Sequence, residues 1–215
     1  MSRRPPIPPA PPPLDPALAR RVEELVRPLY VGLDGAAGFD RVAPLARHAA
    51  ALAGAPESEN PADGRPLDRR LLALLILFHG AVDRLGSLGP GGRLDLFLRG
   101  AGVEEELARR LRAGLGRLTS PGSPTAGPLP IEEAVLHDAL LLDGAGVAAA
   151  AERLMAAGKR RQPLARALAQ LDPGAPSERY RTAAGRRSGA ARRQAALAWI
   201  EDLRRRIAEE ERGTV

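Results

Sequence analysis

Apolar residues recur at intervals of three and four through most of this chain, and this spacing limits the possible fold more than any other feature. From Asp15 onward the spacing is followed by Leu18, Val22, Leu25, Val26 and Leu29. Such intervals place side chains on one face of an α-helix. No stretch shows the alternating β-branched residues that are typical of a strand. We therefore predict an all-α fold, with one helical domain over residues 15–211.

The same spacing predicts further helices over residues 39–53, 67–79, 92–99, 103–118, 130–142, 145–157, 163–171 and 183–211. Residues 67–79 are apolar nearly all round after the first turn, which indicates a buried central helix. The Pro-rich stretches at 55–66 and 120–128 are expected to be loops. Eight prolines lie in residues 1–16, so we expect a disordered or polyproline II tail over residues 1–14.

The composition narrows the possible classes of protein. Apolar residues make up 44% and aromatic residues 3% of the chain, so the core must be built from Leu, Ala and Val. The sequence has no cysteine, which excludes disulfides and thiolate metal sites. Prolines follow the N-terminal arginines where a signal peptide would have an apolar stretch. No apolar run is long enough to cross a bilayer. We expect a cytoplasmic protein without a membrane contact.

The chain is basic, with a formal charge of +6 and a pI of about 10.9. Lys159 is the only lysine, so arginine supplies 31 of the 32 basic residues (32 less one). Abundant Ala, Arg, Gly and Pro are typical of a GC-rich genome, and this bias explains the pI without an anionic ligand. The Arg-rich residues 179–193 are the main candidate for nucleic-acid binding. Few aromatic rings lie near them, so nucleic acid is not the partner we expect.

Three segments carry a family resemblance through their order and spacing: FDRVAPLARHAAALAG at 39–54, LLALLILFHG at 71–80, and LPIEEAVLHDALLLDGAGVAAAAERLMAAGK at 129–159. They resemble the His-Asp (HD) superfamily of metal-dependent phosphohydrolases. Residues 181–207 are similar to the closing helix of one bacterial HD subfamily, whose pattern is Thr-x-x-Gly-Arg followed by small and basic residues. The resemblance covers residues 15–210 and implies an HD-like helical bundle.

The resemblance also implies a metal site, in which imidazoles and carboxylates hold a divalent ion that activates water. The first histidine of the family falls at Gly38, which cannot ligate. The second falls at His79, which matches. The aspartate that follows it in the family falls at Gly80. The late aspartate matches Asp138, so two of four expected ligands survive.

The sequence also offers a remnant metal set of His79, Asp83 and Asp138, because Asp83 lies four residues beyond His79 and is near it if the helix continues. The resemblance implies that the same pocket is lined by Arg41, Gly80, His137, Leu140, Leu141 and Asp143. Leu140 and Leu141 stand where the family has Asp and Arg. Asp143 either matches a later Asp of the family or caps the turn at residues 144–146. Alternatively, His79 is a buried histidine bonded to Asp138 or to a backbone carbonyl.

These departures together indicate a catalytically inactive HD-like protein that acts by binding or regulation. We expect no cofactor, a protein partner, and possible binding of a phosphorylated small molecule through arginines such as Arg41. One alternative is a phosphohydrolase that acts on a nucleotide or another phosphate ester through a divalent metal and an altered ligand set. A second alternative is nucleic-acid binding through the Arg-rich C-terminal helix.

Overall fold

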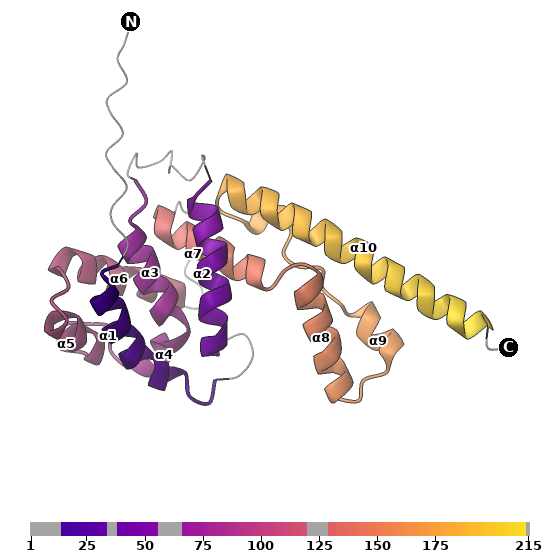
Figure 1. Cartoon of the computed structure of the whole chain (residues 1–215), viewed down its shortest axis with the longest axis horizontal. Coiled ribbons are helices and arrows are strands. Elements are labelled where there is room, and N and C mark those ends of the chain that lie inside the picture. Colours follow the sequence, from indigo (N-terminus) through magenta and orange to yellow (C-terminus); the bar gives the residue numbers. More distant parts are fainter. Residues whose placement is uncertain (1–13, 34–37, 56–65, 120–128, 214–215) are drawn as a thin grey trace, which may run out of the picture. The chain divides into compact units, whose positions relative to one another are not determined.

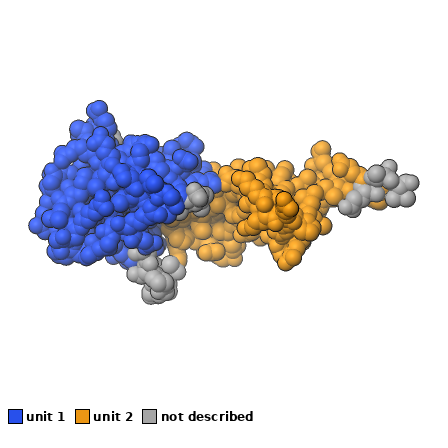
Figure 2. Space-filling model, turned by 90° about the horizontal axis from the view of Figure 1, so that it is seen from below, with its two compact units in different colours: residues 1–136 blue, residues 137–215 orange. Residues whose placement is uncertain are grey.

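A computed structural model describes residues 14–33, 38–55, 66–119 and 129–213 (Figure 1). Every regular element in these ranges is helical, which confirms the predicted all-α fold class. The chain divides into two compact units, residues 1–136 and residues 137–215 (Figure 2). A single domain over residues 15–211 stays a prediction. The expected N-terminal tail and the loops at 55–66 and 120–128 lie almost entirely outside the described residues.

The first unit contains α1 to α6 and the start of α7. Its elements are α1 (Pro16–Val26), η1 (Arg27–Tyr30), η3 (Phe39–Arg41), α2 (Val42–Ala53), α3 (Arg69–Phe78), η4 (His79–Ala81), α4 (Val82–Leu85), α5 (Arg93–Gly100), α6 (Glu105–Thr119) and α7 (Ile131–Asp143). Asp15 caps α1 and Pro16 follows at its first position, as the sequence predicts. The short helices η1, η3, η4 and α4 interrupt or extend the helices that the periodicity predicts.

Helix α3 forms the centre of the first unit, where it packs against α1, α2 and α6. Its buried side chains are Leu71, Leu72, Leu74, Leu75, Ile76 and Phe78, which lie on nearly every face. This confirms the predicted buried central helix. Asp68 begins the helix by accepting hydrogen bonds from the backbone N–H groups of Arg70 and Leu71. The helix ends at Phe78 and is followed by the 3-10 turn η4 and the short helix α4, which contains Asp83.

The second unit contains the end of α7, together with α8 (Val147–Lys159), α9 (Leu164–Ala169), η5 (Ser177–Arg179) and α10 (Ala183–Gly213). Helix α8 packs against α9 and α10, and the start of α10 packs against η5. Many of the buried positions are alanines or glycines, including Ala150, Ala157, Gly189 and Ala196. Small side chains let these helices approach closely.

Helix α10 has 31 residues, which corresponds to a length of about 46 Å at the usual rise per residue. It begins at the predicted residue and ends two residues later than predicted. Among the described helices, none is by itself long and apolar enough to span a bilayer. Helices α7 and α8, bent by 54°, meet such a test of length and composition only as a pair.

Candidate functional site

The space beside Gly80 is occupied by the side chain of Tyr30. A Cβ built on Gly80 would lie 2.8 Å from Cε1 and 2.9 Å from the hydroxyl of Tyr30. The Tyr30 ring is 4% exposed and packs edge-on against Phe39, so it has little room to move. A residue with any side chain at position 80, the aspartate of the HD pattern included, would collide with this ring.

Tyr30 also supplies hydrogen bonds where α3 ends. Its hydroxyl accepts from the backbone N–H of Gly80 at 3.2 Å and donates to the carbonyl of Leu77 at 3.0 Å. A side chain that inserts into the backbone ladder of a helix is a known cause of a break. Burial raises the pKa of Tyr30 to about 12, against the weaker effect of the Gly80 hydrogen bond. The hydroxyl therefore remains protonated and able to donate at neutral pH.

His79 and Asp83 lie in two different short elements, because α3 gives way to the 3-10 turn η4, which begins at His79, and then to α4, which contains Asp83. The half-buried His79 ring places Nδ1 2.7 Å from the carbonyl oxygen of Ile76. Because a carbonyl only accepts, Nδ1 carries the proton in this bond. This is the backbone partner that the sequence offered as one alternative for His79. Asp83 is exposed to solvent.

Asp138 is a fully buried carboxylate that holds the start of α10. Its Oδ1 accepts from the backbone N–H of Arg181 at 2.7 Å, and its Oδ2 accepts from the backbone N–H and the hydroxyl of Thr182, each at 2.7 Å. The Nδ1 of His137 lies 3.1 Å from Oδ1. A carboxylate offers about four lone pairs, so these donors occupy the acceptor capacity of Asp138.

Thr182 and Gly185 complete this cap. The Thr182 hydroxyl oxygen accepts from the backbone N–H of Gly185 at 2.8 Å, as an N-cap residue does. A Cβ on Gly185 would lie 2.1 Å from Oδ2 of Asp138, so the carboxylate sits directly against the backbone of α10. Asp138, Thr182 and Gly185 therefore form one structural unit, which we call the α10 cap.

The donor set that the resemblance implies does not fit a divalent metal. Position 38 and position 80 are glycines, and the oxygens of Asp138 are engaged in the α10 cap. In the part of the chain that the structure describes, no three His, Asp or Glu side chains gather as a metal site requires. No catalytic step through a metal can be derived from these residues.

The remaining residues expected to line the pocket are distributed between the two units. Arg41 is half-buried at the end of η3 in the first unit. His137 is half-buried beside Asp138, and the half-buried Asp143 ends α7 immediately before the turn at Gly144. Leu140 and Leu141 line a cavity in the second unit, but the other expected residues do not.

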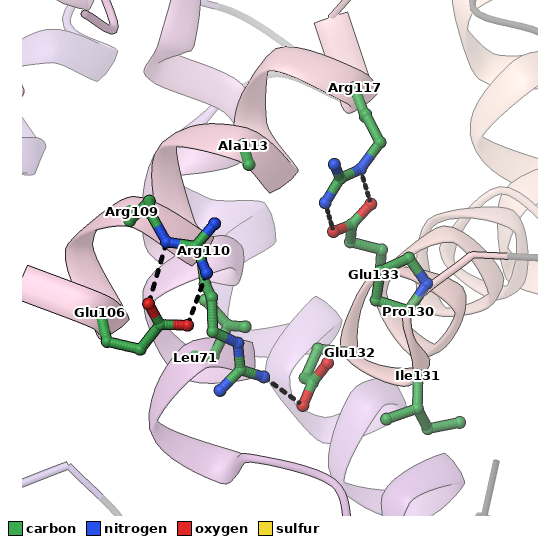
Figure 3. Close-up of a pocket in the computed structure, with 10 residues that line it drawn as sticks. All are labelled: Leu71, Glu106, Arg109, Arg110, Ala113, Arg117, Pro130, Ile131, Glu132 and Glu133. Atoms are coloured by element: carbon green, nitrogen blue, oxygen red, sulfur yellow. Dashed lines mark hydrogen bonds and ion pairs between the residues drawn. The ribbon is translucent and has the colours of Figure 1, made fainter. Parts of the chain in front are cut away.

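A cavity of about 220 Å³ in the first unit brings together three acids and three arginines that the sequence analysis missed (Figure 3). Arg109 pairs with Glu106 at 2.7 Å, Arg110 with Glu132 at 3.1 Å, and Arg117 with Glu133. These residues come from α6 and from the first turn of α7. The three pairs leave the lining with no net charge.

The buried acids of this cavity have structural partners. Glu132 and Glu133 are only 3% and 2% exposed. Glu132 also accepts from the backbone N–H of Asp68 at 2.8 Å, which ties α7 to the start of α3. Two carboxylates this deeply buried require such partners. The spacing of Arg110 and Arg117 by seven residues on α6 was the available signal, because it places both arginines on one helical face.

The Arg-rich stretch 179–193 makes many contacts within its own unit. Arg186 donates to the carbonyl of Tyr180 at 3.3 Å, Arg192 to that of Leu142 at 2.9 Å, and Arg193 to that of Gly174 at 2.6 Å. These bonds hold the three arginines in place within the second unit.

No protein-family model, curated protein or solved structure matches this chain.

Proposed function

We propose that this chain is an HD-like protein that works by binding and does not carry out metal-dependent hydrolysis. The observation that carries the proposal is the α10 cap, because it engages both oxygens of the one aspartate that matches the late HD motif. A carboxylate whose lone pairs accept N–H and O–H groups is not poised to bind a cation. The Tyr30 ring beside Gly80 adds support, since it fills the position of a second ligand.

The role of Asp138 can be separated from metal binding by its effect on stability. Asp138→Asn places an amide N–H₂ group against backbone N–H donors in a buried site, and we expect a loss of about 3 kcal/mol in the free energy of unfolding. The loss should be the same in EDTA and after incubation with Mn, Fe, Mg, Ni or Zn. The exposed Asp83 provides the control, because Asp83→Asn should change stability by less than about 0.5 kcal/mol.

Metal content and turnover test the absence of hydrolysis. The full chain is incubated with each of the same metals, and unbound metal is removed. Its metal content is then measured by mass spectrometry, and its turnover is measured in a general phosphatase and nucleotidase screen. We expect no stoichiometric metal and no turnover that EDTA removes. A stoichiometric metal lost in both His79→Ala and Asp138→Asn, together with their turnover, would refute the proposal in favour of the phosphohydrolase.

A protein partner is part of the proposal, and exposed apolar side chains of α8 support it. Val147 and Met155 lie eight residues apart on α8, near one face of the helix, and are 37% and 62% exposed. An exposed apolar face is the kind of surface that a protein partner would cover. A photo-crosslinking residue at position 155 should give one discrete protein adduct in cells, and the same residue at exposed position 166 should not. Equal labelling from both positions would argue against a partner on α8.

A further inference from the structure

The second unit contains a cavity of about 240 Å³ with an unusual charge. It is lined by Leu140, Leu141, Gly144, Arg153, Asp172, Gly174, Ala175, Pro176, Arg179 and Arg193. All of these residues lie between positions 137 and 215, so the cavity is formed within one compact unit. Three arginines and one aspartate give the lining a formal charge of +2 (three less one).

The arginines of this cavity are held in place without being neutralised. Arg153 donates to the carbonyls of Asp172 and Gly144, at 2.8 and 2.6 Å, and Arg193 donates to the carbonyl of Gly174 at 2.6 Å. Within the described residues, neither of them nor Arg179 forms an ion pair with a carboxylate. A carbonyl oxygen fixes the position of a guanidinium but does not cancel its charge.

The cavity of the first unit differs from this one in the charge of its lining. There, each arginine faces a glutamate, and the lining carries no net charge. Here the guanidiniums keep unused N–H donors, because each has five and Arg153 and Arg193 use two and one of them. Planar arginine forks are the preferred protein group for binding oxyanions.

The remaining lining indicates what else the ligand carries. Leu140, Leu141, Ala175 and Pro176 form an apolar part of the lining, and no aromatic ring lies among the ten lining residues. A nucleobase would find no ring on which to stack. The volume of about 240 Å³ is below the range usual for drug-sized ligands. A short aliphatic body fits these limits better than a nucleoside.

We propose that this cavity binds a small phosphate monoester with a short aliphatic body. A phosphate monoester carries a charge of about −1.5 to −2 at neutral pH, which balances the surplus of the lining. Its oxygens accept from Arg153, Arg179 and Arg193, and its body lies toward Leu140 and Leu141. The site shares no residue with the α10 cap or with the Tyr30–Gly80 contact, so it stands whether or not the proposal on hydrolysis does.

Titration calorimetry of the full chain tests the site, at constant ionic strength, with inorganic phosphate, n-propyl phosphate and acetate as probes. We expect saturable binding of both phosphates, tighter binding of n-propyl phosphate, and weaker binding of acetate. Absence of saturable phosphate binding would overturn the proposal. Acetate binding as tight as phosphate binding would also overturn it, since the cavity would then not distinguish a dianion.

Three variants locate the binding. Arg179 is exposed, and its side chain makes no hydrogen bond within the described residues, so Arg179→Ala should leave the fold intact and weaken phosphate binding about tenfold. Arg166→Ala removes the same charge from an exposed position outside the lining and should change binding less than about twofold. Equal weakening by both would show a diffuse attraction to a basic surface and refute the site.

The third variant, Asp172→Asn, is expected to strengthen phosphate binding. The Asp172 side chain accepts from the backbone N–H of Gly174 at 2.9 Å, and an asparagine oxygen can keep that bond. The substitution removes the one negative charge of the lining, so phosphate should bind several-fold more tightly. Unchanged or weaker binding by a folded Asp172→Asn chain would contradict a phosphate in this cavity. A purely structural role for the arginines predicts no such gain.

Discussion

The contact between Tyr30 and Gly80 predicts that an alanine at position 80 lowers the stability of the fold. An alanine at position 80 would place its Cβ 2.8 Å from Cε1 of Tyr30, and real Cβ contacts are almost never so short. The ring cannot swing into solvent, because it is 4% exposed and its hydroxyl is bonded to Leu77 and Gly80. The neighbouring backbone must therefore shift to accommodate one methyl group.

The expected size of the effect combines two opposing contributions. Adding a methylene-sized group to a packed site typically costs about 1–3 kcal/mol. Replacing a glycine whose backbone suits alanine returns about 0.4–1 kcal/mol, through the unfolded state. Gly80 has no left-handed φ, so this gain applies. The net expectation for Gly80→Ala is a loss of about 1–2 kcal/mol in the free energy of unfolding.

A matched control lies in the same unit. Gly116 is inside α6, and no atom lies within 4 Å of a Cβ built on it. Gly116→Ala should therefore stabilise the chain by about 0.5–1 kcal/mol. Urea unfolding of both variants, at unchanged slope, measures the difference. If Gly80→Ala were as stable as Gly116→Ala, the reasoning that Tyr30 excludes a side chain at position 80 would be refuted.

Two further predictions concern buried polar groups. Tyr30→Phe removes a hydroxyl that both accepts and donates, and it should lower the free energy of unfolding by about 1–3 kcal/mol. Tyr180→Phe removes a buried hydroxyl without a hydrogen-bond partner in the described residues, and it should be neutral or stabilising. A larger loss of stability for Tyr180→Phe than for Tyr30→Phe in urea unfolding would contradict both predictions. The pKa of Asp95 is lowered by the backbone N–H of Gly91 first, and then by Arg99 and Arg112. A lowered pKa stabilises the folded state above the unfolded value of 3.8 and loses that effect as the pH falls through the folded pKa. The stability gap between wild type and Asp95→Asn should therefore be constant from neutral pH down to about pH 5 and shrink below the unfolded value; a gap that is flat at every pH would show that folding does not lower the pKa of Asp95.

The helices follow from the sequence because their signals are local. The N-cap of α1, the buried α3 and the long α10 are all visible in spacing and capping residues. The break after Phe78 is not visible, because its cause is Tyr30, which lies 50 residues from Gly80 in the chain. A periodic apolar pattern indicates a face to bury but carries no information about which side chain inserts into the helix end.

The candidate site was predicted less well for the same reason. Glu132 and Glu133 lie in the first turn of α7 and are buried against arginines from α6, which the sequence analysis did not predict. Leu140 and Leu141 were expected to line a pocket that has Arg41 in its wall. They line one with Arg153, Arg179 and Arg193 instead. Such partners depend on long-range packing, which one sequence without its fold does not specify.

The α10 cap also bears on the HD-like resemblance that we propose. Two of the stretches that carry it are the Asp138 helix and the Thr-x-x-Gly pattern at Thr182 and Gly185. Here these stretches meet each other: Asp138 accepts from Thr182, and its Oδ2 requires a residue without a Cβ at position 185. A structural demand alone thus ties these residue types together across 44 positions of the chain. For Asp138 to bind a metal, it would have to release the donors that start α10, so metal binding and the cap oppose each other. The cap therefore accounts for Asp138, Thr182 and Gly185 by the way α7 joins α10, and this account holds without any family assignment.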